Sequence, residues 1–270
     1  LPEKSDDDFG QLSMAFNQMA DTIVGNMEEM KRTDDLRREL IGNVSHDLRG
    51  PLASLQGYLE TILIKLDSLS KDEMKRFLEI SLDNANNLSS LVSELFELSK
   101  LDARQTEPSI EVFSISELAQ DVVMKYKPHA DEKKISIKAD LDGTMPLVKG
   151  DIGMIERVLS NLLDNAVRYT PENGTVSIVP EMHDSMVRVK ISDTGHGIPE
   201  EDIPHIFGRY YRGKRGISKE KQGTGLGLAI AKKMLELHCS DIKVETAEGK
   251  GTTFHFELEA VQQNIPAEKA

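Results

Sequence analysis

The chain has 270 residues, a formal net charge of −13 and a single cysteine, Cys239. The acidic balance disfavours broad binding to nucleic acid or to anionic membrane surfaces. One cysteine excludes an intrachain disulfide, as is usual for cytosolic proteins. No apolar run approaches the roughly 20 residues of a membrane-spanning helix, and the first residues lack the pattern of a signal peptide.

Residues 11–104 are predicted to be almost entirely helical. Most positions of two interleaved series, 12-19-26-33-40 and 16-23-30-37-44, are apolar, which is the seven-residue spacing of a coiled coil. Asn26, Thr33 and Arg37 interrupt the series, which indicates either a helix that must rotate or a weak coil. The apolar pattern continues to Leu66, and Ser70-Lys-Asp-Glu73 has the form of a capping box that starts another helix. Two such helices cannot enclose a core alone, so we expect two copies to form a four-helix bundle.

A short polar segment around Pro108 ends the helical region, and residues 110–260 then alternate strands with helices. This alternation predicts an α/β sandwich. The predicted strands cover residues 135–141, 175–181, 186–192, 242–246 and 252–259. The predicted helices cover residues 116–129, 151–169 and 226–238. The long polar stretch between Gly195 and Gly225 is typical of a functional loop.

The first motif with chemical meaning is Val44-Ser-His-Asp-Leu-Arg-Gly-Pro-Leu52, inside the helical region. A neutral imidazole at His46 can attack phosphorus with one ring nitrogen. The carboxylate of Asp47 can accept a hydrogen bond from the other nitrogen and stabilise the charge that develops. Pro51 is expected to bend the helix just beyond this histidine.

Three further motifs occur in the α/β region, and each also has a plain structural explanation when taken alone. Asn161 and Asn165 lie four residues apart on one helix, so their amide oxygens share a face and suit Mg²⁺. Asp193 follows a strand and can accept a hydrogen bond from an amine such as that of adenine. The glycine-rich segment 223–228 opens a helix, where free N–H groups favour phosphate.

Together and in this order, the four motifs resemble those of the sensor histidine kinases of two-component systems. Residues 161–170 are similar to the N box of that family, residues 193–198 to its G1 box, Phe207 to Arg212 to its F box and residues 223–228 to its G2 box. The resemblance implies a long helical hairpin that forms a dimeric four-helix bundle, followed by a Bergerat-type α/β sandwich that binds ATP.

The resemblance also implies a role for each matching residue. His46 would accept the phosphoryl group with Asp47 as its acid/base partner, and Asn165 would hold Mg²⁺. ATP would be bound by Asn161, Asn165, Arg168, Tyr169, Asp193, Gly195, Gly197, Ile198, Arg212, Gly223, Thr224, Gly225, Leu226 and Gly227. Phosphate would then pass from His46 to an aspartate in the receiver domain of a response regulator.

Four regions are expected along the chain. Residues 1–30 resemble the end of a HAMP signalling helix, residues 31–104 form the dimerisation and phosphotransfer hairpin, residues 105–262 bind ATP, and residues 263–270 form a tail. We expect a homodimer that binds neither nucleic acid nor membrane directly. It would form the cytoplasmic portion of a longer protein anchored in the inner or plasma membrane upstream.

Gly50 departs from the family pattern. Many members place Thr or Asn four residues after the histidine, where that side chain is thought to orient water for dephosphorylation of the regulator. Glycine has no side chain for that task, so phosphatase activity is open. Two other readings are a nucleotide-dependent chaperone or topoisomerase ATPase, which would leave His46 unexplained, and a non-enzymatic signalling scaffold.

Overall fold

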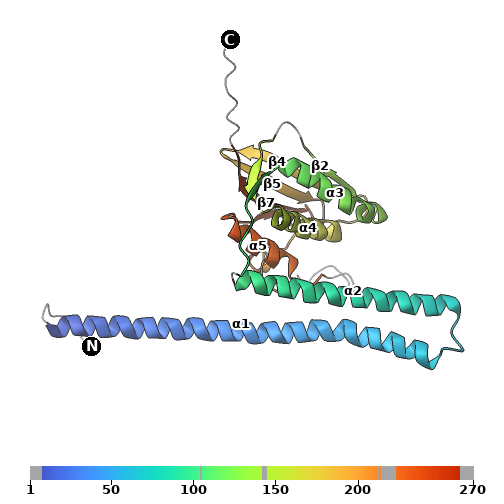
Figure 1. Ribbon diagram of the computed structural model, residues 1–270, viewed down its shortest axis with the longest axis horizontal. Coiled ribbons are helices and arrows are strands. Elements are labelled where there is room, and N and C mark those ends of the chain that lie inside the picture. The colour runs from blue at the N-terminus through green and yellow to red at the C-terminus, as the bar shows by residue number, and fades with distance from the viewer. Residues whose placement is uncertain (1–7, 104, 142–144, 212, 214–222, 262–270) are drawn as a thin grey trace, which may run out of the picture. The chain divides into compact units, whose positions relative to one another are not determined.

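The computed structural model describes residues 8–103, 105–141, 145–211, 213 and 223–261 (Figure 1). Within the first helix, the backbone alone is described for residues 8–10, 26, 28–29, 32–41 and 43–46. The chain forms two compact units, residues 1–88 and residues 89–270. The division falls inside the second helix, so the last turns of that helix belong to the second unit.

The first unit is a helical hairpin. Helix α1 spans Asp8–Ile64 and helix α2 spans Lys71–Asp102. The predicted capping box is confirmed: the Ser70 N–H donates to Glu73 Oε2 at 3.0 Å, and the Glu73 N–H donates to Ser70 Oγ at 3.2 Å. Across the hairpin, the rings of Tyr58 and Phe77 pack with centroids 5.4 Å apart.

Helix α1 runs through Pro51 without interruption. The coiled-coil series and the phosphotransfer hairpin therefore share one helix, in which no break separates residues 30 and 31. The bend that we expected beyond His46 stays a prediction.

The second unit contains a five-stranded sheet of order β2-β4-β5-β7-β6. Strand β2 (Ser136–Ala139) pairs in parallel with β4 (Thr175–His183), and the remaining pairs are antiparallel. The other strands are β5 (Met186–Asp193), β7 (Thr252–Glu259) and β6 (Lys243–Thr246). These five strands match the predicted ones to within a few residues.

Two short strands were not predicted from the sequence. Strand β1 (Glu111–Phe113) and strand β3 (Val148–Gly150) form a separate antiparallel pair. A three-residue strand shows too little alternation to be recognised from its pattern.

Three helices cover the sheet: α3 (Ile115–Glu132), α4 (Ile152–Tyr169) and α5 (Gly227–Leu237) (Figure 1). The strands alternate between buried apolar and more exposed polar positions, so the core lies between the sheet and the helices. The largest buried side chains come from both layers and include Ile155, Leu159, Leu162, Leu163, Ile178, Ile191, Ile230, Leu235 and Phe256. This core fixes the helix and strand ends that carry the motifs.

Candidate nucleotide-binding site

Helix α4 carries the predicted amide residues on the side that faces the glycine-rich segment. Asn161 is only 9% exposed, and among the described residues its Nδ2 is buried without a hydrogen-bond partner. A Cβ atom at Gly227 would lie 3.6 Å from Asn161 Oδ1, so this amide borders the start of α5. Asn165, one turn further along, is half-buried. A buried amide without a partner is costly in a folded protein, and a polar ligand would satisfy it.

The side chain of Arg168 extends from α4 to the glycine-rich segment. Its Nη2 donates to Asp164 Oδ2 at 2.6 Å, an ion pair within one helix. A side chain at position 223 would overlap the Arg168 guanidinium, so Gly223 is what allows this close approach. The predicted N-box and G2-box residues are therefore neighbours, and they bring a positive charge next to backbone that can bind phosphate.

Asp193 ends β5 and is held by backbone donors. Its Oδ1 accepts the N–H of Gly195 at 2.8 Å and that of Thr252 at 3.3 Å. Burial raises the pKa of Asp193, although these N–H donors and nearby His196 act in the opposite direction. A largely buried carboxylate at a strand end suits the recognition of an amine on a planar base.

The Asp193 loop passes close to the C-terminal end of α4. A Cβ atom at Gly195 would lie 2.7 Å from both Asp193 Oδ1 and the carbonyl oxygen of Tyr169, so only glycine fits there. The backbone of the exposed Tyr169 thus lies beside this loop, and its packing beside the base stays a prediction. The structure brings the end of the predicted N box to the predicted G1 box.

Gly197 and Ile198 are fixed against the β6–β7 turn. Gly197 has a φ of 72°, and a Cβ atom there would overlap the carbonyl oxygen of Ala247. The Ile198 N–H donates to Thr246 Oγ1 at 2.9 Å. These contacts give the loop after Asp193 a defined course.

The glycine-rich segment ends at Leu226, which is fully buried, and α5 begins at Gly227. The Leu226 N–H donates to Thr224 Oγ1 at 3.3 Å, and the hydroxyl of Thr224 donates to Glu94 Oε2 at 2.5 Å. Gly225 has a φ of 72°, and its carbonyl oxygen accepts the N–H of Tyr210 at 2.9 Å. Tyr210, inside the predicted F box, is thereby joined to the predicted G2 box.

A second contact anchors Tyr211. Its hydroxyl donates to the buried carboxylate of Asp202 at 2.5 Å. This hydrogen bond is the main reason why the pKa of Tyr211 is raised to about 12, with burial and the charges of Asp202 and Glu201 acting in the same direction. Arg212, the next predicted site residue, lies outside the described residues.

The predicted phosphoacceptor belongs to the first unit. His46 lies within α1, and its side chain is outside the described part of the chain. Asp47 follows it in the same helix and is half-buried. The two residues are consecutive in α1.

Several residues that contact the predicted boxes were not identified from the sequence. Thr252, Thr246 and Asp202 contact the predicted boxes from other parts of the second unit, and Glu94 reaches Thr224 from 130 residues away. Thr246 and Thr252 had a sequence signal near them, since each lies at the end or the start of a predicted strand. The others depend on tertiary contacts that no local pattern encodes.

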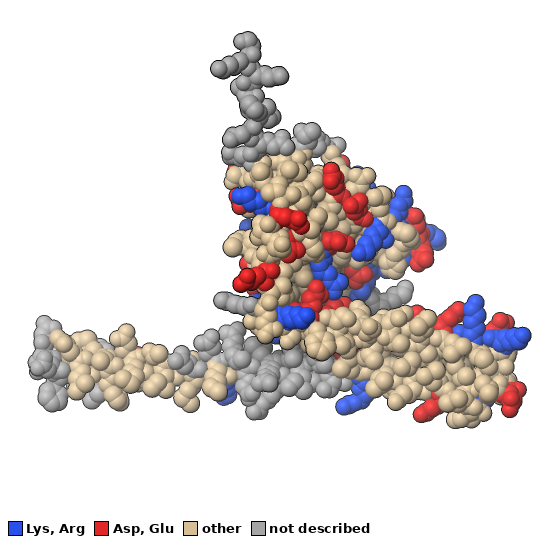
Figure 2. Space-filling model, viewed as in Figure 1, with Lys and Arg blue, Asp and Glu red and all other residues tan. Residues whose placement is uncertain are grey.

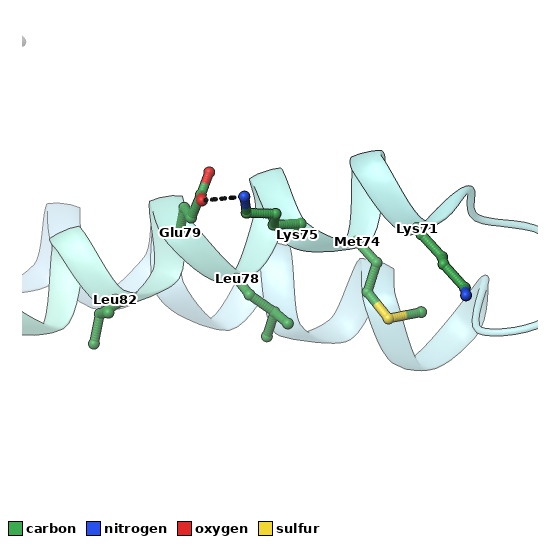
Figure 3. Close-up of a pocket in the computed structure, with 6 residues that line it drawn as sticks. All are labelled: Lys71, Met74, Lys75, Leu78, Glu79 and Leu82. Atoms are coloured by element: carbon green, nitrogen blue, oxygen red, sulfur yellow. Dashed lines mark ion pairs between the residues drawn. The ribbon is translucent and has the colours of Figure 1, made fainter.

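On the face shown in Figure 2, acidic and basic side chains of the second unit are intermixed. A groove on α2 is lined by Lys71, Met74, Lys75, Leu78, Glu79 and Leu82 (Figure 3). Its exposed apolar side chains suit contact with another protein surface.

Among the described residues no cluster of three His, Cys, Asp or Glu side chains could hold a metal, and none of the described helices is long and apolar enough to cross a membrane.

Two family models match the chain in the order that the motifs predict. Residues 36–104 match the His Kinase A (phospho-acceptor) domain, and residues 150–262 match the Histidine kinase-, DNA gyrase B-, and HSP90-like ATPase. The fold and these matches define a phosphoacceptor hairpin joined to an ATP-binding domain. The candidate nucleotide-binding residues lie in the second of these domains, and His46 lies in the first.

Individual relatives agree with this class. The sensor protein SrrB of Staphylococcus aureus is 35% identical over 235 residues, which are 87% of this chain and 40% of SrrB. The solved complex of the histidine kinase ThkA with the response regulator protein TrrA is similar to 88% of this chain and 66% of that one, with 27% identity and a TM-score of 0.69. Full-length ShkA in complex with AMPPNP covers 85% of this chain and 48% of its own, with 26% identity and a TM-score of 0.63.

The chain belongs to the sensor histidine kinases of two-component systems. It spans about two fifths of the length of the curated relatives that it matches.

Proposed function

We propose that the chain binds ATP with Mg²⁺, transfers the γ-phosphoryl group to His46 and then passes it to an aspartate of a response regulator. The observation that carries the proposal is the meeting of Asn161, Arg168 and the glycine-rich segment, with the partly buried carboxylate of Asp193 at a neighbouring strand end. The solved complexes of relatives with AMPPNP and with a response regulator support the same assignment.

Each part of the site has a separate task in this proposal. Asp193 accepts a hydrogen bond from the adenine amine, and Tyr169 packs beside the base. Arg168, Arg212 and the segment from Gly223 to Gly227 bind the phosphates, with Asn161 bordering them. Asn165 holds Mg²⁺ through its amide oxygen, which is a ligand that this hard cation accepts. The bound cation would neutralise charge on the triphosphate.

The chemical step is proposed to form one bond and break one. A ring nitrogen of His46 attacks the γ-phosphorus, and the bond from that phosphorus to the oxygen of the leaving ADP breaks. Asp47 accepts a hydrogen bond from the other ring nitrogen, which fixes the tautomer and stabilises the positive charge on the ring. Asp47 therefore has to be next to His46, as the sequence of α1 provides.

The exposed apolar side chains of the hairpin support a homodimer. Leu63 and Leu82 are 74% and 61% exposed in the single chain, which is more than a stable helix pair tolerates without a partner. We propose that a second copy covers this apolar surface in a four-helix bundle. We also propose that the chain is the cytoplasmic portion of a longer, membrane-anchored sensor whose HAMP segment ends near residue 30.

The decisive experiment is incubation of the chain with γ-labelled ATP and Mg²⁺, followed by a test of the label for acid lability. Phosphohistidine is acid-labile, so the label should be lost in acid and absent from His46→Ala. Nucleotide affinity of His46→Ala should stay unchanged, because the ATP site is built from the second unit. Label that persists in His46→Ala would show that the acceptor is another residue.

The same experiment separates the two other readings. A chaperone or topoisomerase type of ATPase would release labelled phosphate without labelling the protein. A signalling scaffold would bind nucleotide and produce neither product.

A further inference from the structure

The last turns of α2 present three acidic side chains to the ATP-binding domain, all within the second unit. They contact three different elements of that domain: Glu94 with Thr224, Glu97 with Arg157, and Asp102 with Arg209. Leu98, between them, is only 2% exposed. This part of α2 is therefore an integral side of the domain.

The contact of Glu94 differs from the other two because it uses the hydroxyl hydrogen of Thr224 in the glycine-rich segment. Thr224 Oγ1 accepts the N–H of Leu226, and its own hydrogen is donated to Glu94 Oε2 at 2.5 Å. A hydroxyl has one hydrogen to donate. While Glu94 holds that hydrogen, Thr224 cannot donate it to a phosphate oxygen.

The surroundings of Thr224 favour any anion. Thr224 lies three residues before α5, whose first N–H groups and positive dipole end stabilise negative charge. The guanidinium of Arg168 lies beside Gly223, the residue before Thr224. The features that suit a triphosphate here therefore suit the carboxylate of Glu94 as well.

We propose that Glu94 is an internal competitor of the nucleotide: its carboxylate takes the hydrogen-bond position of an ATP phosphate at Thr224, and ATP must displace it to bind. Displacement removes one of the three polar contacts that join Glu94, Glu97 and Asp102 to described residues of the ATP-binding domain, so nucleotide binding loosens the end of α2. This inference rests on the proposed function, because it assumes that the segment 223–227 binds phosphate.

The other two contacts of α2 lie away from the glycine-rich segment, so the proposed competition involves Glu94 alone. Glu97 Oε2 accepts from Nε and Nη2 of Arg157 at 3.2 and 3.0 Å, and Arg209 Nη2 donates to Asp102 Oδ1 at 2.8 Å. Neither pair involves the glycine-rich segment. They hold α2 in place when the contact of Glu94 is weakened, so a variant at Glu94 tests competition without detaching the helix.

The test is Glu94→Gln, which keeps the shape of the side chain and removes its charge. Charge-assisted hydrogen bonds are about twice as strong as neutral ones, so ATP affinity should rise about three- to tenfold. AMP lacks the β- and γ-phosphates that would compete with the carboxylate, so its affinity should stay unchanged. Both affinities can be measured by calorimetry with Mg²⁺ on the full chain.

Glu97→Gln is the matched control. It removes the same charge one turn along the same helix, and screening should keep its effect on ATP affinity within about twofold. Equal gains for Glu94→Gln and Glu97→Gln, equal gains for ATP and AMP, or no gain for ATP would each overturn the competition.

A third variant separates this inference from the proposed function. If Asp193→Asn weakens ATP binding while Glu94→Gln does not change it, the ATP site stands and the competitor role fails. If neither the wild-type chain nor Glu94→Gln binds ATP, both proposals fail.

Discussion

The carboxyl group of Asp193 combines two properties that are in tension, because it is largely buried and must be ionised to accept a hydrogen bond from adenine. Burial raises its pKa above the ordinary aspartate value, while the N–H groups of Gly195 and Thr252 favour the ionised form. Its folded-state pKa is therefore higher than its unfolded value. The ionised form opposes folding, and that cost is relieved as the pH falls through the folded pKa.

For nucleotide binding the same shift has the opposite consequence. The accepting form of Asp193 is present above the raised pKa, so ATP affinity should fall at a pH above that at which an ordinary aspartate, with a pKa of about 4, would titrate. Asp193→Asn should lower affinity about ten- to a hundredfold near neutral pH, because a hydrogen bond to a charged group contributes about 1.5–3 kcal/mol.

Calorimetry over a series of pH values checks both parts of this prediction. The variant should lose the part of the pH dependence that belongs to residue 193, whereas titration of the phosphates themselves should remain in both proteins. A pH profile of Asp193→Asn that is superimposable on that of the wild type would contradict the adenine role.

The residue scale also shows where sequence reasoning succeeds. Asp193, Asn161 and the glycines of the two boxes could be selected from the sequence because each residue type has a chemical reason to occur in its motif, and their roles toward ATP stay predictions. Glu94 and Asp202 were not predictable, since an acidic side chain on a helix or in a loop usually lies in solvent. Their roles come from contacts with Thr224 and Tyr211 that depend on the folded chain.

At the scale of elements, α4 is held at its first turn by Asp151. Oδ1 of this residue accepts the N–H of Met154 at 2.9 Å, and Oδ2 accepts that of Ser109 at 2.8 Å. The backbone N–H of Asp151 donates to His238 Nε2 at 2.9 Å. The cap thus joins the start of α4 both to the segment before β1 and to the end of α5.

Asp151→Ala should destabilise the second unit by about 0.5–2 kcal/mol, the range for loss of a helix N-cap. Burial of Asp151 opposes the ionised form, but the N–H donors outweigh it and lower its pKa. Its contribution to stability should therefore be present above the unfolded pKa of about 4 and be lost as the pH falls through the lower folded pKa.

Urea unfolding at neutral and acidic pH measures this difference. Asp151→Asn, which keeps an acceptor at the cap, should lose less stability than Asp151→Ala. Equal stability of all three proteins would show that the cap contributes nothing measurable.

Gly50 is the element-scale feature with the most direct bearing on activity. A Cβ atom at this position meets no described atom within 4 Å, so a larger side chain fits on the single chain. If a hydroxyl there orients water, Gly50→Thr should raise the rate of regulator dephosphorylation and leave the rate of autophosphorylation nearly unchanged.

Gly50→Ala is the control for helix stiffness, since Ala stabilises a helix by roughly 1 kcal/mol relative to Gly and carries no hydroxyl. Both rates should be measured on the purified variants. A parallel change of both rates in Ala and Thr variants would assign Gly50 to the flexibility of α1 instead.

The types of most elements were predictable because the apolar periodicity in each is long and regular. The five strands of the main sheet and helices α3, α4 and α5 occur where the alternation predicted them. Strands β1 and β3 were missed because pairing with each other, not their own pattern, makes them strands. The parallel pairing of β2 with β4 was likewise beyond the sequence, because register depends on the folded sheet.

At the scale of the whole molecule, the exposed apolar series of α1 predicts assembly. Phe16 and Met19 are 59% and 61% exposed in the single chain. Phe16→Glu should therefore weaken the dimer, because it places a charge in the coiled-coil seam, where apolar side chains are required. Gln18→Glu adds the same charge outside the seam and should have little effect.

Sedimentation of both variants over a range of protein concentrations measures this difference. An unchanged dimer in Phe16→Glu would restrict the interface to the hairpin beyond residue 30.

Because α1 is one uninterrupted helix, the number of residues between two of its positions determines the relative directions of their side chains. Its 57 residues span roughly 85 Å at 1.5 Å per residue. Each residue turns the helix by about 100°, so the spacing between Ile23 and His46 sets the angular phase of the histidine against the seam. One inserted residue would swing His46 to a different face, whereas seven would return it to within about 20° of its starting direction. In a series of variants with one to seven inserted residues, kinase activity should therefore rise and fall with the period of the helix. Such a result would show that the rotational position of α1 controls activity.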